Sequence, residues 1–275
     1  MKIYTLLILL LSGTMIYSQN ASISPFDTTM YGRNEKVGQY INIRGFNMYY
    51  ETYGKGAPVL MIHGNGGSIS SFLYQINYFS QNYRVIVADS RAQGKSMDTG
   101  DSLSYEMMAD DLNELLNKLH LASCYVIGWS DGGINGLLLA IRHPDKVKEL
   151  AITGANLWPD STALNKSFFS WLIPYTDTLK KMKQTPKVKN DFKVANIMVD
   201  QPHITIKQLN NITCPTLVMG GDHDIILPQH TILIAESIPG SYLWILPNSG
   251  HATLITYKDQ FNETVMNFFR EKRTK

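Results

Sequence analysis

Apolar residues in this chain gather into short continuous runs, and the stretches between the runs repeat apolar positions every three or four residues. The short runs predict buried strands over residues 58–62, 84–88, 124–127, 149–153, 215–219 and 242–246. Helical spacing predicts helices over residues 72–79, 107–119, 134–141, 229–238 and 260–270. The repeated alternation of apolar strands with helices predicts a parallel sheet covered by helices on both faces.

Two regions depart from this alternation. Residues 40–44 and 47–53 alternate enough to be a pair of strands, with Gly45 near their turn. Between about residues 155 and 213 the pattern contains no clean strand, and aromatic residues are separated by proline and lysine-rich runs. We expect this stretch to form a small helical lid inserted over the functional site; the alternative is a helix packed on the sheet edge.

The N-terminal segment has the composition of a secretory signal. Lys2 precedes an apolar stretch over residues 3–11, which is shorter than the about 20 residues that span a membrane. We expect a signal peptide over residues 1–18, cleaved after Ser18, an irregular tether over 19–38 and one domain over 39–275. The protein is then secreted or periplasmic, with no stable membrane span in its mature form. The alternative is an uncleaved signal that tethers it to a membrane.

The charge balance argues against a nucleic-acid partner. The 275 residues include 25 Lys and Arg against 23 Asp and Glu, a formal net charge of +2, whereas nucleic-acid binding needs a concentrated basic face. Short lysine and arginine clusters near residues 180 and 270 read as solvated helix faces or a frayed tail. Two cysteines, Cys124 and Cys214, do not make a disulfide framework, and we expect two buried free thiols on strands separated by one other.

The candidate chemistry begins with the segment Gly128-Trp129-Ser130-Asp131-Gly132, which matches the G-x-S-x-G nucleophile elbow. An apolar run leads into it and a helical pattern leads out, so the motif has the strand–turn–helix context that it requires. Such a turn is strained and exposes the serine hydroxyl at the end of the strand. Ser130 is therefore the candidate nucleophile.

A serine hydroxyl needs an adjacent base, and the base needs an orienting acid. His251 lies in a glycine-containing loop just after the last predicted strand, and the ordinary pKa of an imidazole suits proton transfer near neutral pH. Asp224 and Asp222 both follow the strand over 215–219 and compete for the role of acid, while His223 between them is expected to be an exposed loop residue.

Two backbone N–H groups are expected to form an oxyanion hole, each contributing about 2.7–4 kcal/mol. We assign one to Asp131, directly after the nucleophile, and one to Asn65 in the segment His63-Gly64-Asn65-Gly66-Gly67. His63 itself is expected to be structural. Partial matches to a dinucleotide fingerprint at 64–69 and to a phosphate-binding loop at 89–96 each lack a required glycine, and no metal-ligand cluster is present in the sequence, so neither cofactor nor metal is expected.

Taken together, these motifs resemble the α/β-hydrolase superfamily over roughly residues 39–272. The resemblance implies a mostly parallel eight-stranded sheet, an order of nucleophile, acid and histidine along the chain, and an acid placed third after a glycine, which favours Asp224 over Asp222. One departure is Ala92, which stands where a glycine is usual in a structural turn.

The elbow resembles the valacyclovir hydrolase (biphenyl hydrolase-like) branch. In that branch the acidic residue after the nucleophile helps to bind a substrate amino group, which implies this role for Asp131. The alternative is that Asp131 only satisfies the N-terminus of the following helix. Trp129, beside the nucleophile, is a further candidate substrate contact.

The leading functional hypothesis is a carboxylic-ester hydrolase that works through an acyl-enzyme on a small-molecule substrate. Amino-acid esters, lactones and amides are alternative substrates for the same triad. A non-catalytic ligand-binding homologue is the alternative outside enzymology, because fold alone does not fix function.

Overall fold

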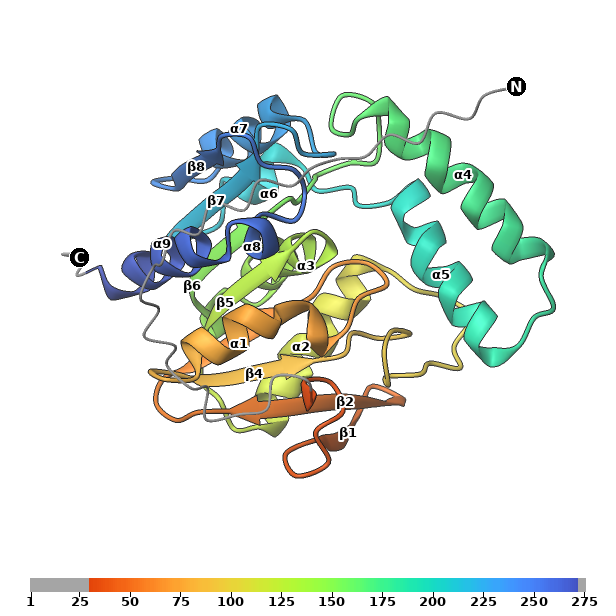
Figure 1. Ribbon diagram of the computed structural model, residues 1–275, viewed down its shortest axis with the longest axis horizontal. Coiled ribbons are helices and arrows are strands. Elements are labelled where there is room, and N and C mark those ends of the chain that lie inside the picture. The colour runs from red at the N-terminus through yellow and green to blue at the C-terminus, as the bar shows by residue number, and fades with distance from the viewer. Residues whose placement is uncertain (1–29, 272–275) are drawn as a thin grey trace, which may run out of the picture.

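The computed structural model describes residues 30–271 and contains one mixed sheet of eight strands in the order β1-β2-β4-β3-β5-β6-β7-β8 (Figure 1). The strands are β1 (Gln39–Ile43), β2 (Phe46–Tyr53), β3 (Pro58–Ile62), β4 (Arg84–Ala88), β5 (Cys124–Trp129), β6 (Val147–Thr153), β7 (Thr216–Gly221) and β8 (Tyr242–Leu246). β2 pairs antiparallel with β1 and β4, and all other neighbours are parallel. The predicted architecture, a mostly parallel α/β sheet, is confirmed.

Helices cover both faces of the sheet, as the alternation predicted. One layer contains α2 (Tyr105–Lys118), α3 (Asp131–Arg142) and α7 (Pro228–Ser237), and the other contains α1 (Leu73–Phe79), α8 (Thr253–Thr256) and α9 (Lys258–Arg270). Short 3₁₀ turns lie at Ile69–Phe72 and Pro144–Lys146. On β3, Leu60 and Ile62 join the core under α3, whereas Val59 and Met61 join the core under α1. Both faces of the strand are buried, which explains its continuous apolar run.

The segment between β6 and β7 contains α4 (Lys166–Lys181), α5 (Pro186–Asp200) and the single turn α6 (Ile206–Leu209). We call residues 166–200 the α4–α5 hairpin. Its helices pack against each other, and α4 lies on the side of α5 that faces away from the sheet (Figure 1). Local signals set the helix starts: Asn165 caps α4, and Thr185 caps α5 ahead of a proline in its first turn.

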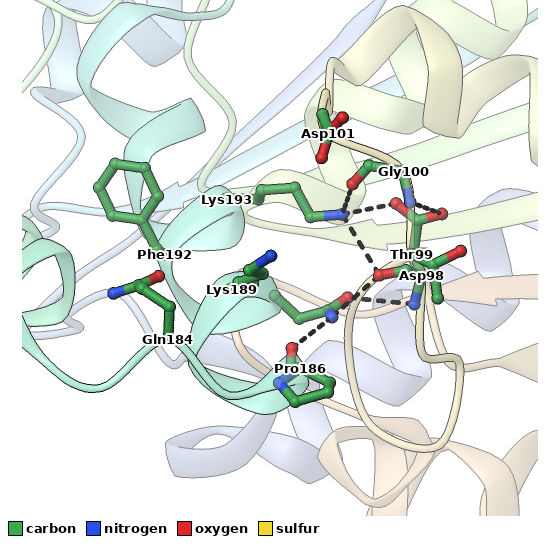
Figure 2. A pocket seen from close by; sticks show the side chains of 10 residues that line it. Asp98, Thr99, Gly100, Asp101, Gln184, Pro186, Lys189, Phe192 and Lys193 are labelled. Carbon is green, nitrogen blue, oxygen red and sulfur yellow. Dashed lines mark hydrogen bonds and ion pairs between the residues drawn. The ribbon is translucent and has the colours of Figure 1, made fainter.

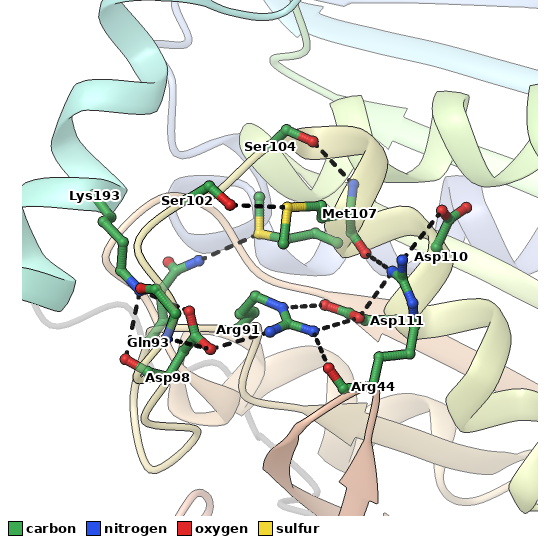
Figure 3. Close-up of polar contacts among 12 residues, drawn as sticks. Arg44, Arg91, Gln93, Asp98, Ser102, Ser104, Met107, Asp110, Asp111 and Lys193 are labelled. Atoms are coloured by element: carbon green, nitrogen blue, oxygen red, sulfur yellow. Dashed lines mark hydrogen bonds and ion pairs between the residues drawn. The ribbon is translucent and has the colours of Figure 1, made fainter.

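A chain of buried charges holds α5 to the core. Lys193 Nζ lies 2.6 Å from Asp98 Oδ2, and Asp98 Oδ1 lies 3.1 Å from Arg91 (Figure 3). Arg91 in turn donates two hydrogen bonds to Asp111 of α2, at 2.7 and 2.8 Å. Burial raises the pKa of Asp98, but Lys193, the Gly100 amide and Arg91 outweigh it, so the pKa lies below its ordinary value. Removing one partner would leave a buried charge uncompensated, so this network of charges fixes α5 against the core.

Cys124, at the start of β5, is buried as predicted, but Cys214 is partly exposed and precedes β7 instead of lying in it. Both are free thiols, and β6 lies between β5 and β7. The predicted signal peptide lies outside the described residues. Of the predicted tether, residues 30–38 are described, and the amides of Gly32 and Asn34 donate to Glu51 of β2. Within residues 30–271 no helix is long and apolar enough to cross a membrane.

Candidate active site

Ser130 stands at a sharp turn between β5 and α3, with φ of 57° and ψ of −121°. This positive φ is strained for a residue with a side chain, and the flanking glycines permit it. A Cβ at Gly132 would overlap the carbonyl of Ile62, and a Cβ at Gly128 would overlap the backbone of Gly132. The glycines of the motif are therefore required by close backbone packing.

The side chains of Ser130, His251 and Asp224 form a continuous hydrogen-bonded chain. His251 Nε2 lies 2.9 Å from Ser130 Oγ, and His251 Nδ1 lies 2.6 Å from Asp224 Oδ1. Asp224 is buried, and its Oδ1 also accepts a hydrogen bond from the Ile226 amide. An anionic acceptor at Nδ1 keeps the proton on that nitrogen, so Nε2 is free to accept the proton of the serine hydroxyl.

The competing acid has a different position. Asp222 is exposed, and its Oδ1 accepts a hydrogen bond from the Ser249 amide at 3.0 Å. It therefore holds the loop that carries His251 without touching the imidazole. His223 is exposed, as expected.

The loop after β3 lies against the elbow. A Cβ at Gly64 would come within 3.0 Å of the Ser130 Cβ, so the peptide that carries the Asn65 N–H lies beside the nucleophile. His63 is buried and structural: its Nε2 accepts from the Ser90 amide at 2.9 Å, and its Nδ1 contacts the Gly64 carbonyl at 2.7 Å. Burial lowers the pKa of His63, which suits a neutral ring in this role.

Asn65 has a second role that the sequence does not reveal. Its side-chain amide donates to Asp131 Oδ2 at 2.8 Å and to the Val194 carbonyl of α5 at 2.7 Å. One side chain thus connects the loop after β3, the elbow and the α4–α5 hairpin. No local pattern could indicate this, because the three segments are distant in sequence.

Trp129 does not line the cavity beside Ser130, so its predicted role as a substrate contact is not supported by its position. Its indole Nε1 instead donates to the His251 carbonyl at 2.9 Å, and the two rings lie 6.0 Å apart. Alternation along β5 explains this arrangement, because Trp129 points to the α1 side of the sheet with Ile127. Trp129 therefore positions the histidine loop.

A small cavity of about 30 Å³ adjoins the serine. Most of its wall is apolar. The apolar part comes from the segment before α4, from α4 and α5, and from the loop after Asp224. The lining residues are Tyr105, Ser130, Asp131, Asn156, Leu164, Phe168, Met198, Gln201, Ile225 and Ile226. Within the described part of the chain, no group of three or more His, Cys, Asp or Glu residues could hold a metal ion.

Asp131 is the charged residue of this cavity. Its carboxyl is buried between the side chains of Asn65 and Tyr105, so it does more than satisfy the start of α3. Burial raises its pKa from 3.8 to about 6, although hydrogen bonds from Asn65 and Tyr105 and the charge of His251 act in the opposite direction. Burying a carboxylate costs free energy, and this carboxylate lies one residue from the nucleophile. Asp131 is therefore a candidate for a role in substrate binding.

Replacing Asp131 by asparagine is expected to stabilise the protein above pH 6. A carboxyl whose pKa rises from 3.8 to about 6 on folding destabilises the ionised folded state by on the order of 3 kcal/mol. This cost is complete above pH 6 and disappears as the pH falls toward 4, because the folded state then takes up the proton first. Denaturant unfolding at pH 8, 6 and 4.5 should show the gain of Asp131→Asn shrinking with pH. Asp222→Asn, at an exposed carboxylate, should show no gain; equal stability of Asp131→Asn and wild type at pH 8 would contradict the argument.

The sheet order, the elbow and the Ser130–His251–Asp224 geometry define a class, the α/β hydrolases, and the model of the alpha/beta hydrolase fold matches residues 57–178. The chain has the α/β-hydrolase fold. Among similar proteins, the putative carbamate hydrolase RutD of Serratia proteamaculans is 26% identical over 254 residues, covering 80% of this chain and 94% of the relative. The serine hydrolase BPHL of Mus musculus is 24% identical over 250 residues, covering 84% and 85%, in agreement with the predicted branch.

Solved structures support the same fold. The esterase EaEST from Exiguobacterium antarcticum is 27% identical with a TM-score of 0.74, covering 85% of this chain and all of the esterase. The enol-lactonase from Burkholderia xenovorans LB400 is 21% identical with a TM-score of 0.71, covering 85% of this chain and all of the lactonase. These relatives share a sheet and differ in substrate, so the substrate has to be argued from the cavity of this chain.

Proposed function

We propose that this chain is a serine hydrolase that cleaves carboxylic esters through an acyl-enzyme. The hydrogen-bonded chain from Ser130 through His251 to Asp224 is the observation that carries the proposal. Among the relatives, an esterase and a serine hydrolase support it.

In the proposed reaction, Ser130 attacks the ester carbonyl while His251 takes its proton. The N–H groups of Asn65 and Asp131 stabilise the negative oxygen of the tetrahedral intermediate. His251 then protonates the leaving alcohol and activates a water that releases the acid, while Asp224 stabilises the imidazolium in both half-reactions. No cofactor is needed for these steps.

The cavity supports small substrates. The cavity beside Ser130, about 30 Å³, is too small to enclose a long acyl chain, so short acyl groups are favoured and a long one requires the α4–α5 hairpin to move. The apolar wall favours an acyl group without charge. Lactones and carbamates remain within reach of the same triad, as the names of two relatives indicate.

A second candidate is an amino-acid esterase, which the burial of Asp131 favours. A carboxylate that lines the cavity next to the nucleophile could accept hydrogen bonds from a substrate α-ammonium group and so recover part of its desolvation cost.

A panel of p-nitrophenyl esters tests both candidates. Turnover is expected to be fastest from acetate to butyrate and to fall toward decanoate, because longer chains exceed the cavity. The alanine ester and the propanoate ester differ only by an α-amino group: faster turnover of the alanine ester, lost in Asp131→Asn, would select the amino-acid esterase. Mass spectrometry after treatment with a fluorophosphonate should find the adduct on Ser130. A folded protein with neither turnover nor adduct would contradict the proposed function and favour the ligand-binding alternative.

A further inference from the structure

The α4–α5 hairpin concentrates positive charge that the rest of the chain lacks. Residues 166–200 hold seven of the 25 Lys and Arg residues but three of the 23 Asp and Glu residues, so the remaining chain is slightly acidic. Residues 180–187, which form the tip between the helices, are all exposed. The hairpin's ion pairs use Lys187 and Lys193. Within residues 30–271, none of Lys180, Lys181 and Lys183 has a carboxylate at ion-pairing distance.

An apolar stripe leads along α4 to this cationic tip. Trp171, Tyr175 and Met182 are 55%, 40% and 48% exposed. Trp171 and Tyr175, four residues apart, lie on one side of α4, and Met182 follows directly after the last residue of the helix. Trp171 stacks on Tyr175 with ring centroids 5.2 Å apart, and Phe168 lies 6.1 Å from Trp171. Phe168 also lines the cavity beside Ser130. The stripe therefore runs from the candidate active site to the lysines of the tip.

This combination matches the chemistry of an anionic lipid surface. Tryptophan and tyrosine favour the boundary between headgroups and acyl chains, and lysines beside an apolar face attract anionic headgroups while their stems lie along the apolar surface. A second copy of this chain fits poorly, because it would bring the same lysines together. A nucleic acid would leave the exposed apolar side chain of Met182 without a partner.

We propose that the α4–α5 hairpin docks on a lipid bilayer with anionic headgroups through the apolar stripe and the lysines of its tip. The first half of α5, next to the tip, is held to the loop of Asp98 and Gly100. Asn190 exchanges hydrogen bonds with the backbone of Asp98, and Lys193 contacts the Asp98 carboxylate and the Gly100 carbonyl (Figure 2). Docking of the stripe would hold the cavity lined by Phe168 close to the lipid interface. The proposal requires no turnover and is independent of the proposed function.

Flotation of the full-length chain with lipid vesicles tests the proposal. Vesicles of phosphatidylcholine alone are compared with vesicles of equal parts phosphatidylcholine and phosphatidylglycerol. We expect binding to the anionic vesicles that weakens with added salt. The triple variant Lys180→Gln, Lys181→Gln, Lys183→Gln should bind at least about tenfold more weakly, given the attraction of each lysine to an anionic surface. The double variant Trp171→Ala, Tyr175→Ala should also bind more weakly.

Matched controls distinguish binding through the hairpin from binding through general positive charge. All variants keep the apolar N-terminal segment, so a difference in binding between them does not come from that segment. Lys36, Lys55 and Lys207 are exposed lysines outside the hairpin, and their exchange for glutamine removes the same charge without an expected loss of binding. Brominated acyl chains should quench the fluorescence of wild type more than that of Trp171→Phe. Equal binding by all variants, with no quenching that depends on Trp171, would overturn the proposal, as would binding only to RNA or to a second copy.

Discussion

Exchange of Ser130 for alanine is expected to lower kcat on a short-chain ester by about 10⁴-fold or more while the protein remains folded. The hydroxyl is the atom that His251 contacts at 2.9 Å, and its removal leaves the oxyanion donors and the cavity but no nucleophile. Alanine retains the Cβ of serine, so the strain of the positive φ at position 130 is unchanged. Initial rates with p-nitrophenyl acetate and a thermal unfolding curve for each protein measure both properties.

The control for this experiment is Ser70→Ala, at an exposed serine in the turn before α1. It should retain wild-type turnover. If Ser130→Ala kept more than about one hundredth of the wild-type kcat, a loss of under 3 kcal/mol in transition-state stabilisation, the nucleophile would have to be another group.

Exchange of Asp224 for asparagine is expected to lower kcat by about 10³- to 10⁴-fold with little change in KM. The amide N–H of asparagine can donate a hydrogen bond to Nδ1 of His251. This favours the tautomer that carries the imidazole proton on Nε2, which points a donor at Ser130 instead of an acceptor. The amide also cannot stabilise the imidazolium formed during attack. Asp224 is buried 2.6 Å from the ring, so no water replaces its charge.

Asp222→Asn is the matched control, because it makes the same chemical change two residues away. Asp222 contacts the Ser249 amide and not the imidazole, so its exchange should alter kcat by less than about tenfold. A large loss in Asp222→Asn together with a small loss in Asp224→Asn would exchange the two assignments. Kinetics of both variants on one ester, at one pH, decide between them.

The strands and helices were predictable because each has a one-dimensional signal. β4 (Arg84–Ala88) begins and ends at the predicted residues, since an interior strand is buried on both faces and its residues 85–88 form a continuous apolar run. The elbow was equally readable, because its glycines are demanded by backbone contacts within the motif and with β3. Cys214 was predicted less well: a cysteine beside a strand gives no local signal of whether it is enclosed.

Side chains that meet across the fold were not predictable in the same way. Trp129 was expected at the substrate, but the pleat of β5 turns it toward the opposite face, where it binds the loop of His251. The charged chain from Lys193 to Asp111 joins α5, a loop and α2, and no spacing in the sequence connects them.

The sequence by itself determined the α/β architecture, the position of the elbow and the identity of the candidate nucleophile and base, because these depend on periodicity and on motifs within a few residues. The tertiary structure decided which aspartate contacts His251, that Asp131 is buried with a raised pKa, and that Asn65 links the elbow to α5. It also decided that Trp171 and Tyr175 of α4 are exposed. Burial, desolvation and contact between distant segments exist only once the chain has folded.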